Sequence, residues 1–172
     1  MSLAVVNSRG LDGLDAPEVT VEVHLANGLP SFTLVGLADT EVKEARERVR
    51  AALASSGLAF PHNRRVTVNL APADLPKESG RFDLPIALGI LAADGQIDAA
   101  KLAHYEFAGE LSLAGDLRPI RGALDGLVAA PSRCVTRTGF AHGECMRGCA
   151  RAGSAGGRGG ASAGGRRRAA AR

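Results

Sequence analysis

One stretch near the middle of the chain decides the fold, and it reads Asn69-Leu70-Ala71-Pro72-Ala73-Asp74-Leu75-Pro76-Lys77-Glu78-Ser79-Gly80-Arg81-Phe82-Asp83-Leu84-Pro85-Ile86-Ala87-Leu88-Gly89-Ile90-Leu91-Ala92-Ala93. It begins as the end of a strand, passes through a loop with prolines and charges, and then enters a run that is apolar on nearly every side. A helix that is apolar all round is a buried one, so we expect residues 83–93 to form the central helix of a core. Asp83 is expected to cap this helix, and Pro85 suits its first turn, where a missing N–H does no harm.

The loop before this helix gathers polar side chains of the kinds found in active sites: Lys77, Glu78, Ser79, Arg81 and Asp83. Two interpretations that do not exclude each other are open. In the first the loop is structural, with Asp83 capping the helix and Arg81 paired with Glu78 or a neighbouring acid. In the second, Lys77, Glu78, Arg81 and Asp83 form a contact surface for another domain or subunit.

The residues upstream predict strands. In residues 19–25, Val19, Val21, Val23 and Leu25 alternate with polar side chains, which is the period-two pattern of a half-buried strand. Residues 3–7 predict a strand before it, and Asn27-Gly28 is a strong hairpin signal before residues 31–35. We therefore expect three antiparallel strands in meander order.

A helix is predicted from Asp39 or Thr40, either of which can cap it, to about residue 55, with Gly57 closing it. Its apolar stripe is Val42, Ala45, Val49, Ala52 and Leu53, and its polar face is Lys43, Glu44, Arg46, Glu47, Arg48 and Arg50. The polar face is interpreted as a solvated surface with pairs such as Glu44–Arg48, with a partner surface as the alternative.

Further strands are expected over residues 65–70, 107–113 and 117–120, the last two joined by a turn at residues 114–116. A third helix is predicted over residues 123–130. Strands and helices interleave, so the fold class is α/β (α+β) with a mixed sheet, and residues 1–130 form one domain.

The charge of the chain is divided unevenly. Residues 131–172 hold nine arginines, ten glycines and a single acid, for a net charge of +8, whereas residues 1–130 carry a net charge of −5. The acidic balance of the first part argues against a nucleic-acid surface there. The tail lacks apolar periodicity, so we expect it to be disordered. It is interpreted either as a basic nucleic-acid-binding tail or as an out-of-frame product of GC-rich coding sequence, because the pattern stops where a helix has just begun.

Signals for metal binding and for export are weak. The cysteines all lie in the tail, and the spacing of Cys134, His142, Cys145 and Cys149 matches no familiar zinc site, so we expect no metal. No signal-peptide pattern and no apolar run of about 18 residues is present, which predicts a cytoplasmic protein without a membrane span.

Three segments of the chain together carry a family resemblance: residues 35–53, residues 69–93, and Gly109-Glu110-Leu111-Ser112-Leu113 with Arg118-Pro119-Ile120-Arg121-Gly122. They resemble the N-terminal domain of magnesium-chelatase-like AAA+ ATPases of the ComM (YifB) type, over about residues 3–130. The resemblance implies a Lon-protease-like, ribosomal protein S5 domain 2-like fold, incomplete at its C-terminal end. It also implies that full-length relatives continue into an ATPase module that uses ATP and Mg²⁺, assemble as hexamers, and act as branch-migration helicases in natural transformation.

The chemistry of these relatives is not matched in the chain. Comparison with Lon places Phe82 at the nucleophile and Leu124 at the lysine base, and Ser79 would need a shifted register. No Gly-x-x-x-x-Gly-Lys-Ser/Thr string is present to hold phosphates. We therefore expect a non-catalytic domain without a cofactor, truncated before the ATPase module, whose partners are that module or neighbouring subunits, with DNA as a further candidate partner. A stand-alone nucleic-acid-binding protein that uses the Arg/Gly tail is the alternative.

Overall fold

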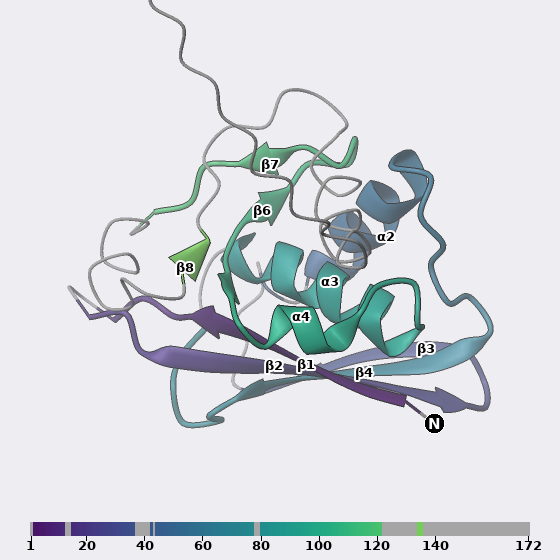
Figure 1. Ribbon diagram of the computed structural model, residues 1–172, viewed down its shortest axis with the longest axis horizontal. Helices are drawn as coiled ribbons and strands as arrows, with labels where there is room; N and C mark the ends of the chain where they lie inside the picture. Colours follow the sequence, from purple (N-terminus) through teal and green to yellow (C-terminus); the bar gives the residue numbers. More distant parts are fainter. Residues whose placement is uncertain are drawn as a thin grey trace, which may run out of the picture.

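The protein folds into a mixed sheet with helices on one of its faces (Figure 1). The computed structural model describes residues 2–12, 15–36, 42, 44–77, 80–121 and 134–135. The sheet order is β3-β4-β2-β1-β5-β8. Its strands are β1 (Ser2–Arg9), β2 (Glu18–Asn27), β3 (Ser31–Val35), β4 (Arg64–Ala71), β5 (Glu106–Phe107) and β8 (Cys134–Val135). The helices are α2 (Ala45–Ser55), α3 (Asp83–Ala93), the short α4 (Ala99–Leu102) and a 3-10 turn, η1 (Gly80–Phe82). The predicted mixed α/β class is confirmed.

The predicted three-stranded meander is wrong. β1 and β2 do pair antiparallel, but β4 lies between β2 and β3, and β3 runs parallel to β4. The pairing of β2 with β4 sets Val21 beside Leu70 and Val23 beside Val68, and all four side chains are buried. Asn27-Gly28 is a local turn signal, and it cannot report the long-range pairing of β2 with β4.

Helix α3 is the centre of the core, as predicted. Ten of its eleven residues are buried, and it packs across β1 and β2. Gly89 permits that close contact, because a Cβ there would lie 2.5 Å from Cγ2 of Val23. The helix ends as expected at Asp94 and Gly95: Gly95 has a φ of +78°, and the N–H of Gln96 donates back to the Leu91 carbonyl.

The predicted apolar stripe faces the core, since Ala45, Val49, Ala52 and Leu53 of α2 are all buried, as is Val42, which precedes the helix. Gly57 closes it with a φ of +72°. The predicted caps Asp39 and Thr40 lie outside the described residues. The prediction of a solvated polar face is wrong at Arg48. Its side chain is only 19% exposed, and it turns inward to an acid of α3.

The strand predicted over residues 107–113 is instead broken into β5 and β6 (Glu110–Leu111), and only β6 forms a hairpin with β7 (Leu117–Arg118). The break lies at Gly109, whose N–H donates to the Arg81 carbonyl and whose carbonyl accepts from Leu84 N–H. These bonds draw the segment out of the main sheet and onto the start of α3. The predicted turn is confirmed at Gly115, which has a φ of +91°.

The predicted tail contributes two described residues. Cys134 and Val135 form β8, which pairs parallel with Glu106 and Phe107 of β5. The rest of residues 131–172 and the helix predicted over residues 123–130 lie outside the described part of the chain. Within that part, no helix has the length and apolar character needed to cross a membrane.

Candidate functional site

The loop singled out in the sequence leads to a buried ion pair at the start of α3. The carboxylate of Asp83 is fully buried, and it accepts from Arg48 Nε at 2.6 Å and from Arg48 Nη2 at 3.1 Å. It also accepts from the Leu111 N–H at 3.2 Å. The predicted helix cap is therefore wrong. Phe82 occupies the N-cap position without a side-chain cap, and the Asp83 carboxylate bonds to other elements instead.

These contacts bring together the three segments that carry the resemblance. Arg48 comes from the first segment, Asp83 from the second and Leu111 from the third. The predicted Glu44–Arg48 pair is also present, at 3.7 Å, so Arg48 links an exposed acid to a buried one. We call Arg48, Asp83 and Leu111 the Asp83 junction.

Burial and ion pairing oppose each other at the Asp83 junction. Burial raises the pKa of Asp83 above its ordinary value, although the hydrogen bond and charge of Arg48 and the Leu111 N–H act in the opposite direction. The hydrogen bond from Arg48 to Asp83 in turn raises the pKa of the guanidinium. The pair is held by desolvated, directed bonds, which suits a structural link between helices.

The other described members of the predicted contact surface are also buried. Lys77 is 1% exposed, and its ammonium donates to the Pro72 carbonyl. Its pKa is lowered by burial, against an opposing effect of the Asp74 charge. Arg81 is 3% exposed and donates to the carbonyls of Gly10 and Arg121. Glu78 and Ser79 lie outside the described residues, so a contact role for this set stays a prediction.

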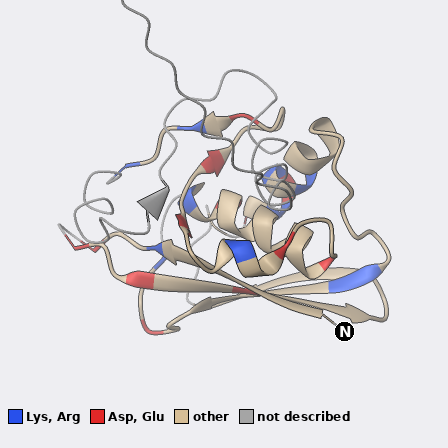
Figure 2. Cartoon of the chain, in the orientation of Figure 1, with Lys and Arg blue, Asp and Glu red and all other residues tan. Residues whose placement is uncertain are grey.

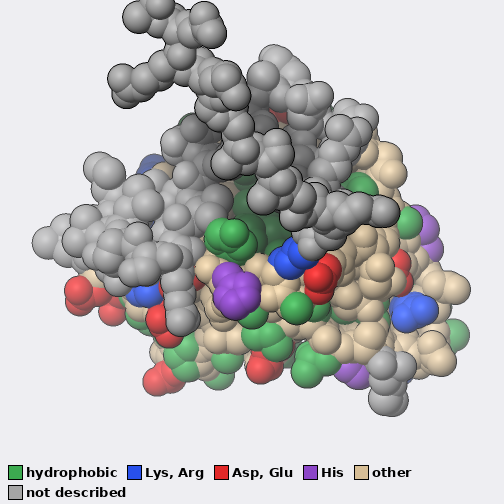
Figure 3. All heavy atoms as spheres, viewed as in Figure 1, with side chains coloured by type: hydrophobic (Ala, Val, Ile, Leu, Met, Phe, Trp, Pro, Cys, Tyr) green, Lys and Arg blue, Asp and Glu red, His purple; other side chains and the backbone are tan. Residues whose placement is uncertain are grey.

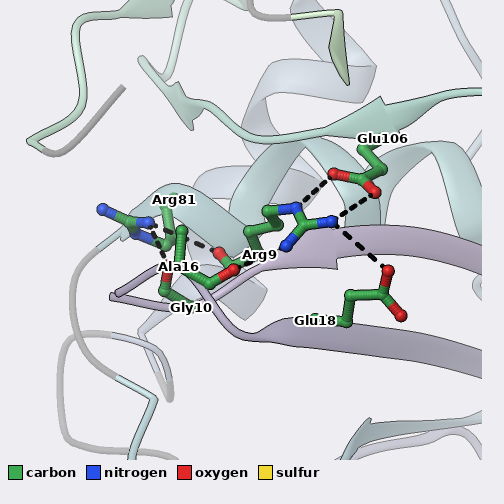
Figure 4. A network of polar contacts seen from close by, with 6 residues as sticks. All are labelled: Arg9, Gly10, Ala16, Glu18, Arg81 and Glu106. Carbon is green, nitrogen blue, oxygen red and sulfur yellow. Dashed lines mark hydrogen bonds and ion pairs between the residues drawn. The ribbon is translucent and has the colours of Figure 1, made fainter. Parts of the chain in front are cut away.

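A second ion network is centred on Arg9, and the sequence analysis did not predict it (Figure 4). Arg9 on β1 binds both carboxylate oxygens of Glu106 on β5, at 2.7 and 3.1 Å. It also donates to the Ala16 carbonyl at 2.7 Å and to Glu18 at 3.3 Å. Arg81 reaches the same loop through the Gly10 carbonyl. The partners are up to 97 residues apart in sequence, so no local pattern signals the pairing.

The position aligned with a Lon nucleophile is apolar and inaccessible. Phe82 is 0% exposed and belongs to the hydrophobic core. Leu124 and Ser79 lie outside the described residues. Among the side chains that the structure describes, no group of three or more His, Cys, Asp or Glu residues could hold a metal ion. The described geometry at the start of α3 therefore stabilises the fold, and the position of Phe82 offers no nucleophile.

A family model described as subunit ChlI of Mg-chelatase matches residues 21–138. The chain belongs to this ChlI family. It is 58% identical over 130 residues to "Competence protein ComM" of Haemophilus influenzae, and 54% identical over 130 residues to "Uncharacterized protein YifB" of Escherichia coli. A Mycobacterium tuberculosis relative, "Uncharacterized protein Rv2897c", is 39% identical over the same length. The resemblance to the ComM and YifB type is confirmed.

Each alignment with these ChlI-family relatives takes in 76% of this chain but only 25–26% of the relative. The chain therefore spans about a quarter of the length of the proteins that it matches. The activities of the remaining three quarters are properties of those relatives. For this chain they can only be proposed.

Proposed function

We propose that this chain supplies the non-catalytic N-terminal domain of a ComM-type AAA+ ATPase. The observation that carries the proposal is the 58% identity to a competence protein over 130 residues that make up only 25% of that protein. We infer that the domain, whose core is built around a buried helix, works together with the further domains of such longer relatives.

The chemistry of the described site supports a structural role. The carboxylate of Asp83 accepts three hydrogen bonds, and the residue before it, Phe82, is an apolar member of the core. Covalent catalysis needs a nucleophile beside a base that activates it, and the described residues 80–93 at the start of α3 include no serine, threonine or cysteine. ATP and Mg²⁺ would be bound by the ATPase module of a full-length relative.

In the intact protein the domain would lie beside a hexameric motor that moves branched DNA. The loop of Lys77, Glu78, Arg81 and Asp83 would contact the ATPase module or a neighbouring subunit. Because Lys77, Arg81 and Asp83 are buried, these three would act by fixing the shape of the loop and not by touching the partner themselves.

The test begins with the gene. Reading all three frames beyond codon 130 should reveal one that continues the third helix and later encodes a P-loop. The protein made from that frame should hydrolyse ATP with Mg²⁺ and move a four-way DNA junction. Deleting residues 1–130 from it should impair branch migration more than ATP hydrolysis. The absence of a P-loop in every frame would contradict the proposal.

A stand-alone nucleic-acid-binding protein is the second candidate. It is favoured by the nine arginines and the net charge of +8 in residues 131–172. Phosphate contacts by such a tail would give binding that weakens steeply with salt. Loss of all DNA binding on deletion of residues 131–172, together with stop codons in the other frames, would select this candidate over the first.

A further inference from the structure

A basic groove lies away from the Asp83 junction, between α2, the start of β3 and the segment that leads into β4. Its volume is about 310 Å³. The side chains that matter for its chemistry are three arginines, one histidine and two phenylalanines: Arg46, Arg50, Arg64, His62, Phe32 and Phe60. Figure 2 shows blue segments both on α2 and at the start of β4, the two elements that supply the arginines. We call it the arginine groove.

Local structure explains why these side chains meet. Arg46 and Arg50 are four residues apart on α2, so they project from one face of the helix. Arg64 is the first residue of β4. Its side chain lies on the same face of the strand as those of Val66, Val68 and Leu70, which are buried beneath the helices. Arg64 therefore points toward the helix layer, whereas its neighbour Arg65 points to the opposite face of the sheet. That alternation provides a matched control.

The charges in the groove are unbalanced. Arg46 binds Glu47 at 2.7 Å, but within the described residues neither Arg50 nor Arg64 makes a side-chain hydrogen bond or an ion pair. Like charges at i,i+4 destabilise a helix slightly, so the fold gains nothing from Arg46 and Arg50 together. On the face shown in Figure 3, by contrast, described charges of both signs are mixed. The net charge of −5 over residues 1–130 conceals this local concentration of positive charge.

Aromatic rings stand beside the arginines. The rings of Phe60 and His62 are 5.6 Å apart and inclined at 53°, with His62 exposed and Phe60 half-buried. Guanidinium groups bind phosphate oxygens in a forked geometry, and exposed rings stack on nucleobases. An acidic peptide would satisfy the arginines but leave the rings without a counterpart.

We propose that the arginine groove binds a short segment of single-stranded nucleic acid, with Arg50 and Arg64 on phosphates and His62 against a base. Its volume suits one or a few nucleotides, whereas a duplex would need a longer basic surface. Such a site deepens the proposed function, and it rests on that function only for the choice of DNA over RNA.

The test measures fluorescence anisotropy of a labelled oligothymidylate about twelve nucleotides long, titrated with the full chain. Arg50→Gln/Arg64→Gln should weaken binding about tenfold or more and make the salt dependence shallower by about 1.4 in slope, roughly 0.7 for each lost phosphate contact. His62→Ala should weaken binding about fivefold or more through lost stacking. Arg65→Gln removes the same charge one residue away on the other face, and it should change binding less than about twofold.

The nine tail arginines are present in every variant, so their contribution cancels in the comparison. Glu47→Gln should tighten binding, because it removes the acid beside Arg46. Circular dichroism checks folding, and Arg50→Gln alone replaces the double variant if that variant unfolds.

Equal losses in Arg65→Gln, or no loss in Arg50→Gln and His62→Ala, would overturn the proposal. Displacement by thymidine monophosphate or polyglutamate at concentrations comparable to the oligonucleotide would also overturn it, in favour of a nucleotide or an acidic peptide. A failure here leaves the P-loop search unaffected, so the two proposals can fail separately.

Discussion

At the scale of single residues, the Asp83 carboxylate is fully buried, while the Arg48 side chain that binds it is 19% exposed. Removing one member of a buried pair leaves the other without compensation, but removing both can be nearly neutral. Arg48 has a second acid, Glu44, and access to water. Within the described part of the chain, the Asp83 carboxylate accepts only from the Leu111 N–H besides Arg48. The cost of breaking the pair should therefore be greater when Arg48 is removed.

Arg48→Met should lower the free energy of unfolding by about 3–5 kcal/mol, because it strands a buried carboxylate. The double variant Arg48→Met/Asp83→Leu should be more stable than Arg48→Met alone. Urea unfolding of the two single variants and the double variant gives the coupling energy. Arg46→Met breaks an exposed pair on the same helix, and it should cost less than about 1 kcal/mol. Additive costs at Arg48 and Asp83 would show that the pair is not coupled.

The raised pKa of Asp83 predicts the sign of a pH effect. Between its ordinary value of 3.8 and its higher value in the folded protein, the folded state binds a proton that the unfolded state has lost. The contribution of Asp83 to stability is therefore fully present below 3.8 and is lost as pH rises through the folded pKa. The stability of the native chain minus that of Asp83→Asn should fall from acid to neutral pH in urea unfolding. A difference that rises with pH would mean that Arg48 outweighs burial.

At the scale of elements, the contact of α3 with the sheet depends on a missing side chain. A Cβ at Gly89 would lie 2.5 Å from Cγ2 and 3.3 Å from Cβ of Val23, a stiff β-branched residue. Alanine is the better helix former by about 1 kcal/mol, so helix propensity and packing have opposite signs here. Packing should prevail, because neither α3 nor β2 can move without disturbing the rest of the core.

Gly89→Ala should therefore lower stability by about 1–2 kcal/mol, the overpacking cost less the gain in propensity. The same change in a Val23→Ala background has room for the added methyl group, and there it should raise stability by up to about 1 kcal/mol. Thermal or urea unfolding of the four variants measures this reversal of sign. A loss of equal size in both backgrounds would assign the effect to something other than Val23.

Elements with a sequence period of their own were predicted correctly. The stripe from Val42 to Leu53 repeats with the helical period, and each of its five members is buried. The order of the strands was not predicted correctly, because Asn27-Gly28 reports only a turn and not that β4 inserts beside β2. Sequence patterns identify which face of an element is buried, but they do not say which element covers it.

The site shows the same limit. The loop before α3 was identified from its polar residues, but their partners were not. Arg48 lies 35 residues from Asp83, and Arg9 lies 97 residues from Glu106. An arginine on the polar side of a helix looks the same in sequence whether it meets water or a buried acid. The arginine groove was also missed, because its residues come from three separate segments and the net charge of residues 1–130 is negative.

At the scale of the whole molecule, the main sheet extends into the segment that was predicted to be a tail. β5 has β1 on one side and β8 on the other, and β8 is only Cys134–Val135. The match to the ChlI family model also runs past residue 130, to residue 138. The β5–β8 pairing and the family match are two reasons to test whether residues 134–138 belong to the domain. An edge strand that loses its neighbour exposes unpaired N–H and C=O groups, which favours association between molecules.

Two truncated chains test whether β8 belongs to the domain. One ends at Thr138 and keeps β8, and the other ends at Arg133 and lacks it, so they differ by five residues. The longer chain should match the full chain in urea unfolding, because it keeps the β5–β8 pairing. The shorter one should lose about 1 kcal/mol for the missing ladder hydrogen bonds and should self-associate more on size-exclusion chromatography. Equal stability and equal monomer content in the two chains would show that β8 adds nothing, and would place the end of the domain before it.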